Sequence, residues 1–100
     1  MAYRIVNLAE AHLACEGIYE DSQFSDSQGH KHVWKLEADA LTWLNSRFYS
    51  AAERGSLVPI EIPIPDEKLI QSHIDTFNCS WVYKAALKDL KGLRAKRWIA

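Results

Sequence analysis

The sequence lacks the features that mark membrane-spanning and secreted proteins. No apolar run approaches the roughly eighteen residues that a spanning helix needs. The chain has two cysteines, Cys15 and Cys79, whereas a small secreted scaffold usually carries about four or more. The first residues read Met-Ala-Tyr-Arg-Ile-Val-Asn and lack the apolar core of a signal peptide. We therefore expect a cytoplasmic protein with two free thiols and no membrane contact.

Glycine is also scarce, and the short motifs of common enzyme sites are missing. Only four glycines are present, too few for a loop that cradles phosphate. The sequence contains no Gly-x-Gly-x-x-Gly, Walker loop, His-Glu-x-x-His or Gly-x-Ser-x-Gly pattern. Motifs thus give no reason to expect an enzyme. We predict no catalytic residue and no cofactor, and a small enzyme ranks third among the functions considered.

Histidines and cysteines do not form a recognisable ligand set. His30 and His32 would share one side of an extended segment, but a zinc site needs roughly three or four converging ligands. His12 and Cys15 lie three residues apart on an expected helix and could touch, yet no third group marks a catalytic arrangement. Cys15 lies on the apolar side of that helix, where free cysteine behaves as a small hydrophobe. We predict neither a metal site nor thiol catalysis.

What the chain does contain is the composition of one globular domain. It has 48% hydrophobic and 25% charged residues in 100 positions, with no internal repeat and no linker. We therefore treat residues 1–100 as a single domain. Four tryptophans are many for this length, and we expect at least two of them to be buried. They are Trp34, Trp43, Trp81 and Trp98.

Apolar spacing predicts helices over much of the chain. Asn7 and Glu10 form a capping box that begins a helix over residues 8–19. A second helix is predicted over 38–54, with Gly55 as its natural end.

The last third of the chain is also predicted to be helical. Pro65 and the acids after it open a helix that runs to about residue 79, and a last helix follows from 80 to 97. The residues that recur at helical spacing form the predicted core. They are Leu41, Leu44, Phe48, Ile70, Ile74, Phe77, Leu87 and Leu90.

Short strands are predicted at residues 3–6, 32–36 and 58–64. The segment 32–36 would equally fit the first turn of the next helix. Along 58–64, aliphatic side chains alternate with Pro59, Glu61 and Pro63. Since proline has no N–H, the prolines remove donors from one edge, which predicts an edge strand or an extended arm. Residues 20–32 are predicted to be a polar loop.

Together these elements predict an α+β fold that is mostly helical. The expected architecture is a compact single domain of three to four helices with short strands, and an all-α fold is the alternative.

Charge is distributed unevenly along the chain. The net charge is −1, but residues 84–100 hold six of the twelve basic side chains and a single acid. On the predicted last helix, Lys84, Lys88 and Lys91 would share one face, extended by Arg94. Such a face can neutralise phosphates, so nucleic-acid binding is the alternative function. The near-neutral total and the pI of 6.4 argue against a dedicated nucleic-acid binder.

The main prediction for function is a non-catalytic module that docks on a larger protein or protein complex. A small, aromatic-rich domain without catalytic motifs acts through a partner. Small inhibitors and adaptors, including those of phages and mobile elements, have this general build, which is an analogy of build alone.

The predicted partner surface combines a tryptophan with neighbouring arginines, the composition of interface hot spots. It consists of Trp98, Arg94 and Arg97, with Phe24 as an addition. A second copy of the chain is the alternative occupant. Trp34, by contrast, is expected to cover one end of the core.

Changing Lys84, Lys88 and Lys91 to glutamine tests the nucleic-acid alternative. If these side chains bind phosphates, the variant binds more weakly. The slope of log affinity against log salt concentration is then smaller by about one unit for each phosphate that is no longer neutralised. We expect the unmodified chain to show no binding to random duplex or single-stranded oligonucleotides near physiological salt, measured by fluorescence anisotropy. Micromolar binding under those conditions would favour the alternative.

Overall fold

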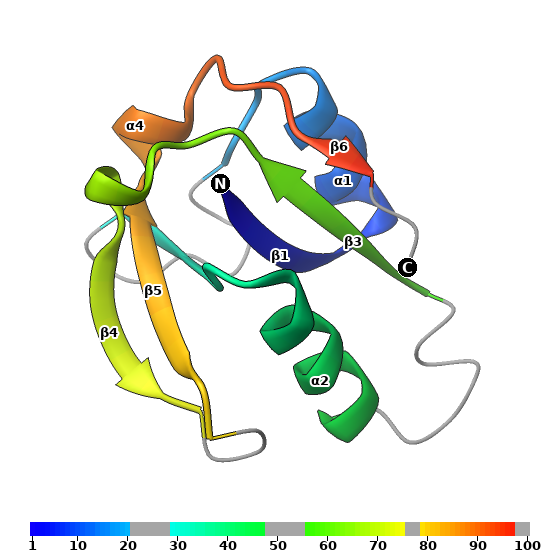
Figure 1. The fold of residues 1–100 in the computed structure, drawn as a ribbon. Coiled ribbons are helices and arrows are strands. Elements are labelled where there is room, and N and C mark those ends of the chain that lie inside the picture. The colour runs from blue at the N-terminus through cyan, green and yellow to red at the C-terminus, as the bar shows by residue number, and fades with distance from the viewer. Residues whose placement is uncertain (21–28, 48–55, 76–78, 98–100) are drawn as a thin grey trace.

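The computed structural model describes residues 1–20, 29–47, 56–75 and 79–97 (Figure 1). Their elements are, in chain order, β1 (Ala2–Asn7), α1 (Leu8–Cys15), β2 (His30–Val33), α2 (Glu37–Arg47), β3 (Leu57–Ile62), the short 3-10 helix η1 (Asp66–Lys68), β4 (Ile70–Ile74), β5 (Trp81–Ala86), α4 (Leu87–Leu90) and β6 (Lys96–Arg97).

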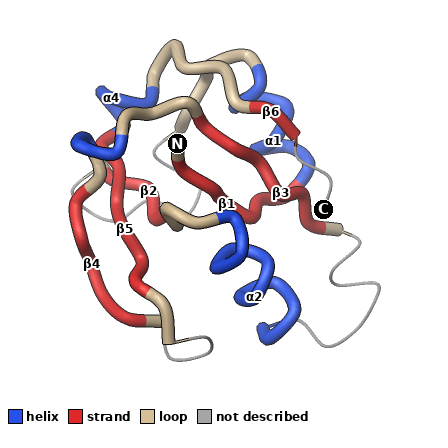
Figure 2. The backbone as a smooth tube through the Cα atoms, viewed as in Figure 1, coloured by secondary structure: helices blue, strands red, loops and turns tan. Residues whose placement is uncertain are grey.

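In the described residues, the strands form two antiparallel sheets of three strands each. One has the order β1-β3-β6 and the other β2-β5-β4. Tyr3 and Trp34 join the two sheets, because each backbone N–H donates to the other's carbonyl, over 2.8 and 2.9 Å. Figure 2 shows the β4–β5 hairpin standing at one side of the molecule, with α2 lying beside β1.

The prediction of a mostly helical fold is wrong. Where two long helices were expected between residues 65 and 97, the chain forms η1, three strands and the single turn of α4. The apolar residues of this region include Ile70, Ile74 and Trp81, whose side-chain types favour pleated strands over helices. Their spacing alone could not separate the two states, since short apolar runs fit both periods. Pairing with partner strands decided the outcome.

The N-terminal half follows the prediction more closely. A strand, a capped helix and a second helix were expected, and β1, α1 and α2 occupy those places. The Asn7 side chain accepts a hydrogen bond from the Glu10 backbone N–H at 2.8 Å, which begins α1 as the capping pattern predicted. Part of the predicted polar loop is instead strand β2, and residues 21–28 lie outside the described residues.

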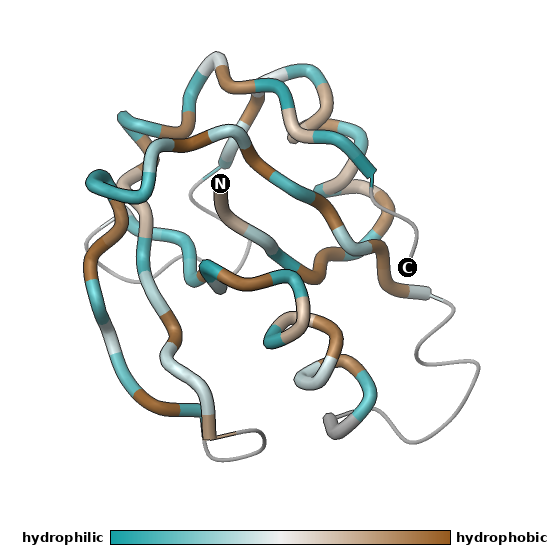
Figure 3. Tube along the Cα trace, in the orientation of Figure 1, coloured by the Kyte–Doolittle hydropathy of each residue, from teal (hydrophilic) through white to brown (hydrophobic). Residues whose placement is uncertain are grey.

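Strand β3 is central in its sheet, which corrects its assignment as an edge strand. It pairs with β1 from Leu57 to Ile62, but with β6 only at Ile60 and Glu61. Pro63, which has no N–H to donate, lies beyond the Glu61 end of that short pairing. Figure 3 shows the alternating hydropathy along β3 that places its isoleucines in the core.

The core is built from aliphatic and small side chains of both sheets, α1 and α4. Ile60, Ile62 and Leu90 are fully buried. Of the predicted core, Leu44, Leu87 and Leu90 are buried and Leu41 is half-buried. Ile70 and Ile74 are 48% and 51% exposed, so their assignment to the core is wrong. Phe48 and Phe77 lie outside the described residues.

The end of α1 packs closely against the C-terminal segment. Gly17 has a φ of +79°, and a Cβ there would meet the Gly92 backbone at 3.0 Å. Gly92 N–H donates to the Gly17 carbonyl at 2.9 Å. The buried Tyr19 hydroxyl donates to the Leu93 carbonyl at 2.6 Å, and burial raises the pKa of Tyr19 to about 12. Tyr19 therefore stays a neutral donor over the physiological pH range.

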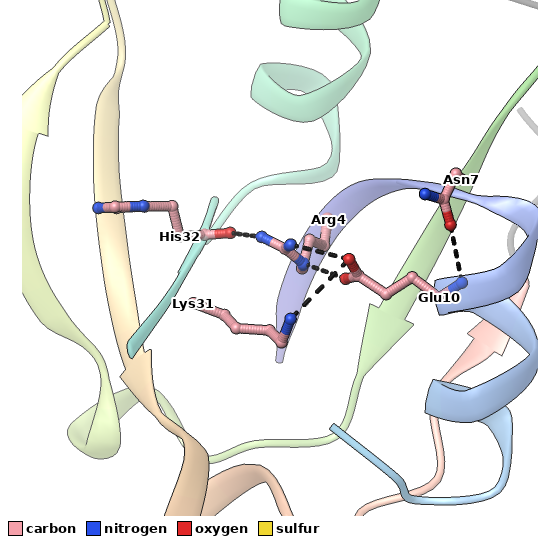
Figure 4. Close-up of polar contacts among 5 residues, drawn as sticks. All are labelled: Arg4, Asn7, Glu10, Lys31 and His32. Atoms are coloured by element: carbon pink, nitrogen blue, oxygen red, sulfur yellow. Dashed lines mark hydrogen bonds and ion pairs between the residues drawn. The ribbon is translucent and has the colours of Figure 1, made fainter. Parts of the chain in front are cut away.

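One buried ionic cluster connects β1, α1 and β2 (Figure 4). Arg4 Nε and Nη2 donate to the two carboxylate oxygens of Glu10 at 2.6 and 3.2 Å. Arg4 Nη1 donates to the His32 carbonyl at 2.7 Å, and Lys31 Nζ lies 3.8 Å from Glu10 Oε1. The Lys31 side chain is fully buried. The Glu10 carboxylate is thus the shared anion of two buried cations from different strands.

Replacing Ile60 and Ile70 separately by alanine tests the observed core. Ile60→Ala should lower the free energy of unfolding by about 2–5 kcal/mol, because it leaves a cavity between the sheet and α1. Ile70→Ala should cost about 1 kcal/mol or less, since Ile70 is half exposed. Urea denaturation measures both variants. Equal decreases in stability would mean that β4 is packed as deeply as β3.

Replacing Glu10 by glutamine tests the buried cluster. Glu10→Gln keeps the backbone cap at Asn7 but leaves Arg4 and Lys31 without their shared anion. Removing one partner of a buried ion pair costs roughly 3–5 kcal/mol. Glu16→Gln is the matched control, because Glu16 is exposed at the end of the same helix and its replacement should change stability by about 0.5 kcal/mol or less. Coincident urea midpoints for the two variants would contradict the role given to Glu10.

Candidate functional site

The residues predicted to bind a partner do not meet in the described part of the structure. Phe24 and Trp98 lie outside the described residues. Arg94 and Arg97 are both exposed, but they have different neighbours. Arg97 Nη2 lies 3.4 Å from a ring nitrogen of His12 on α1. Arg94 lines a small hollow next to β3, and the surface around Trp98 stays a prediction.

The basic face proposed for nucleic-acid binding is not formed as expected. Lys84 belongs to β5 and is half-buried, whereas Lys88 belongs to the single turn of α4. Lys91 follows that turn, and Arg94 lies in the segment before β6. In the described residues no continuous helix holds these side chains on one face, so the predicted helical face is wrong, and nucleic-acid binding by these residues stays a prediction.

Two exposed apolar side chains, Leu36 and Trp81, lie at one hollow, close to the starts of α2 and β5. Leu36 is 62% exposed and Trp81 43% exposed. They border an open hollow of about 400 Å³, which we call the Trp81 surface. Its described lining residues are Lys35, Leu36, Asp39, Cys79, Ser80, Trp81 and Tyr83.

Trp81 is exposed at the start of β5, whereas Tyr83 is half-buried and packs against the main core. Trp81 and Tyr83 share one side of the strand, while Val82 between them is buried against Trp34 and Ala40. This alternating pattern was the signal for the Trp81 surface in the sequence, and the helical interpretation concealed it.

The turn of the β4–β5 hairpin positions Trp81. Asp75 N–H donates to the Ser80 carbonyl at 2.8 Å, and Cys79 N–H donates to the Asp75 carbonyl at 2.9 Å. Cys79 has a φ of +54°, a left-handed conformation that is uncommon for a residue with a side chain. These hydrogen bonds place Trp81 directly after a tight closure, opposite Ile74 on β4. The closure therefore holds the indole at an exposed end of the sheet.

A charged rim accompanies the apolar side chains. Lys35 Nζ lies 4.5 Å from the centre of the Tyr83 ring, within the range of a cation–π contact. Asp39 supplies a negative charge on the same lining. An exposed tryptophan beside a half-buried tyrosine and charged side chains is typical of protein-binding hot spots.

A second hollow, of about 300 Å³, lies between β1 and α2. Its described lining residues are Arg4, Ile5, Val6, Asn7, His32, Trp34, Trp43 and Leu57. The centroids of the Trp34 and Trp43 rings lie 5.3 Å apart. Trp34 is buried, as expected for a ring that covers one end of the core, and its indole N–H has no hydrogen-bond partner among the described residues. We refer to this hollow as the tryptophan cavity.

Cys15 and His12 are the pair that the sequence offered as a candidate catalytic arrangement. Cys15 is a half-buried free thiol and Cys79 an exposed one. The His12 ring lies against Arg97. Among residues that the structure describes, no group of three or more histidine, cysteine or acidic side chains could hold a metal ion. Nor does any described helix have the length and apolar character to span a membrane.

Comparisons with protein-family models, with curated proteins and with solved structures found no match to this chain. The candidate site is therefore interpreted from its own geometry.

Proposed function

We propose that this chain is a non-catalytic protein-interaction module that docks on a larger protein through the Trp81 surface. The observation that carries the proposal is the pair of exposed side chains, Trp81 and Leu36, at the border of an open hollow. Tryptophan is enriched among the residues that contribute most to binding, and such residues cluster near the centre of an interface, often in pockets.

The chemistry of the Trp81 surface suggests the kind of partner. Trp81, Leu36 and Tyr83 offer apolar area, and a partner's aliphatic or aromatic side chain would fill the hollow between them. Lys35 and Asp39 carry opposite charges, so together they do not attract a strongly charged partner. They would instead form polar contacts at the rim that orient the partner. This balance favours a protein partner over nucleic acid, which needs several cations on one face.

The open edge of β4 supplies a second contact. Within the described residues, β4 pairs with β5 alone, so its outer backbone groups face away from the sheet. An extended segment of the partner can add to such an edge. Ile74, which is exposed and lies opposite Trp81, would then connect the edge with the Trp81 surface.

The role we propose is that of a small inhibitor or adaptor in the cytoplasm. Both described cysteines are free, and Cys79 is exposed beside the Trp81 surface. An exposed thiol in that position is compatible with a reducing compartment.

Trp81→Ala tests the docking surface. A partner is first captured by a photo-crosslinker attached to Cys79, then purified, and its affinity is measured for each variant by calorimetry. Trp81→Ala should weaken binding by about 2 kcal/mol or more, and Leu36→Ala by a smaller amount. Ile18→Ala is the matched control, because Ile18 is also 43% exposed but lies after α1.

Two results would contradict the proposal. Equal partner affinity for Trp81→Ala and Ile18→Ala, with both folds intact by circular dichroism, would exclude the Trp81 surface. Release of the captured partner after nuclease treatment would indicate instead that nucleic acid connects the two proteins.

A further inference from the structure

The tryptophan cavity lies where β1 and β2 diverge. Tyr3 and Trp34 exchange two backbone hydrogen bonds, at 2.8 and 2.9 Å, but this bridge is isolated and the two strands belong to different sheets. In the register of the bridge, the next facing residues are Ile5 and His32, and both line the cavity. The cavity is therefore found where a longer β1–β2 ladder would have continued.

One backbone donor and one backbone acceptor face this place, and both belong to Ile5. Alternate residues of a strand present their N–H and C=O groups to the same edge, so Ile5 directs both groups toward β2, as Tyr3 does. On the β3 side, Ile5 lies opposite Pro59, which has no N–H to donate. The His32 carbonyl already accepts from Arg4 Nη1 at 2.7 Å (Figure 4). In the described residues β1 and β2 form no ladder at Ile5, so its two backbone groups are left for a ligand.

Apolar side chains form most of the cavity wall. Trp34 and Trp43 supply the aromatic part, and aliphatic side chains complete it, among them Ile5, Val6 and Leu57. The volume of about 300 Å³ is at the lower end of the range of small-molecule pockets, roughly 300–1,000 Å³. Mostly apolar walls with a few fixed polar groups are usual in such pockets.

The shape of the cavity and its polar groups select the ligand. The bridge at Tyr3 closes one end, so a peptide strand cannot run through between β1 and β2, whereas a compact molecule can enter. A flat ring can pack against an indole. To pair with Ile5, the ring must carry a donor and an acceptor side by side, as a cyclic amide does. A carboxylate has no donor for the Ile5 carbonyl, and Arg4 on the lining disfavours a cation.

We propose that the tryptophan cavity binds one small, flat, uncharged molecule through a cyclic-amide edge. The ligand N–H donates to the Ile5 carbonyl, and the ligand C=O accepts from the Ile5 N–H. This pair of bonds repeats the exchange that Tyr3 makes with Trp34. The inference goes beyond docking at the Trp81 surface and does not depend on it, because the described linings of the two hollows share no residue.

Titration with 2-quinolinone, a bicyclic cyclic amide, tests the site. In ¹⁵N NMR spectra, the backbone amide signal of Ile5 and the indole signals of Trp34 and Trp43 should shift together, with one equivalent bound. N-Methyl-2-quinolinone keeps the ring and the C=O but has no N–H. It should bind about tenfold more weakly, because the Ile5 carbonyl then has no donor in the complex.

Variants at two tryptophans separate the cavity from the rest of the surface. Trp43→Leu keeps an apolar side chain on α2 but removes one aromatic wall, and it should weaken 2-quinolinone binding about tenfold. Trp81→Ala is the matched control and should bind as the unmodified chain does, because Trp81 lies outside the cavity. Circular dichroism checks the fold of both variants.

Leu57→Phe keeps the test decisive if Trp43→Leu does not fold. The larger side chain occupies part of the cavity from β3, and it should also weaken 2-quinolinone binding. The proposal is overturned if 2-quinolinone does not bind, or if N-methyl-2-quinolinone binds equally well. It is also overturned if Trp81→Ala loses binding while the cavity variants keep it.

Discussion

The ionic cluster of Arg4, Glu10 and Lys31 is the constraint on which the rest of the structure depends. Its three side chains come from β1, α1 and β2, so satisfying one buried carboxylate requires both sheets and the first helix to be in place together. A buried charge without its partners is strongly destabilising, and this penalty disfavours other arrangements of the same elements. The Tyr3–Trp34 bridge adds backbone pairing between the two sheets.

Because the cluster and the aliphatic core hold β1, β2 and the inner part of β5, the β4–β5 hairpin extends beyond them. Ile70 and Ile74 are therefore exposed on a strand that contributes little to the core. The two faces of the hairpin differ. One carries Trp81 and Tyr83, and the other carries His73, which the Ser72 bulge turns toward His32. The docking proposal thus concerns the exposed end of this hairpin, where side chains that the core does not need can serve a function.

Local signals predicted the first half of the chain better than the second. The cap at Asn7 and the alternation along β3 depend on neighbouring residues, so β1, α1, α2 and β3 could be placed from sequence. The segment from Ile70 to Leu90 has apolar residues that fit both helical and extended periods, and helices were predicted where strands form. In the candidate site, the helical interpretation placed Trp81 at the start of the predicted last helix. The His32–His73 pair had no sequence signal.

The sequence by itself determined a mixture of helices and strands, a cap at the start of α1, an aliphatic face on β3 and the absence of familiar catalytic motifs. These properties follow from composition and from interactions within a few residues. Only the tertiary structure decided that residues 70–86 form a hairpin and that Trp81 is exposed. It also decided that Lys31 is buried beside Glu10 and that His73 meets His32. The physical reason is that strand pairing and the burial of charge depend on residues distant along the chain. The energies of these long-range contacts cannot be read from a short stretch of sequence.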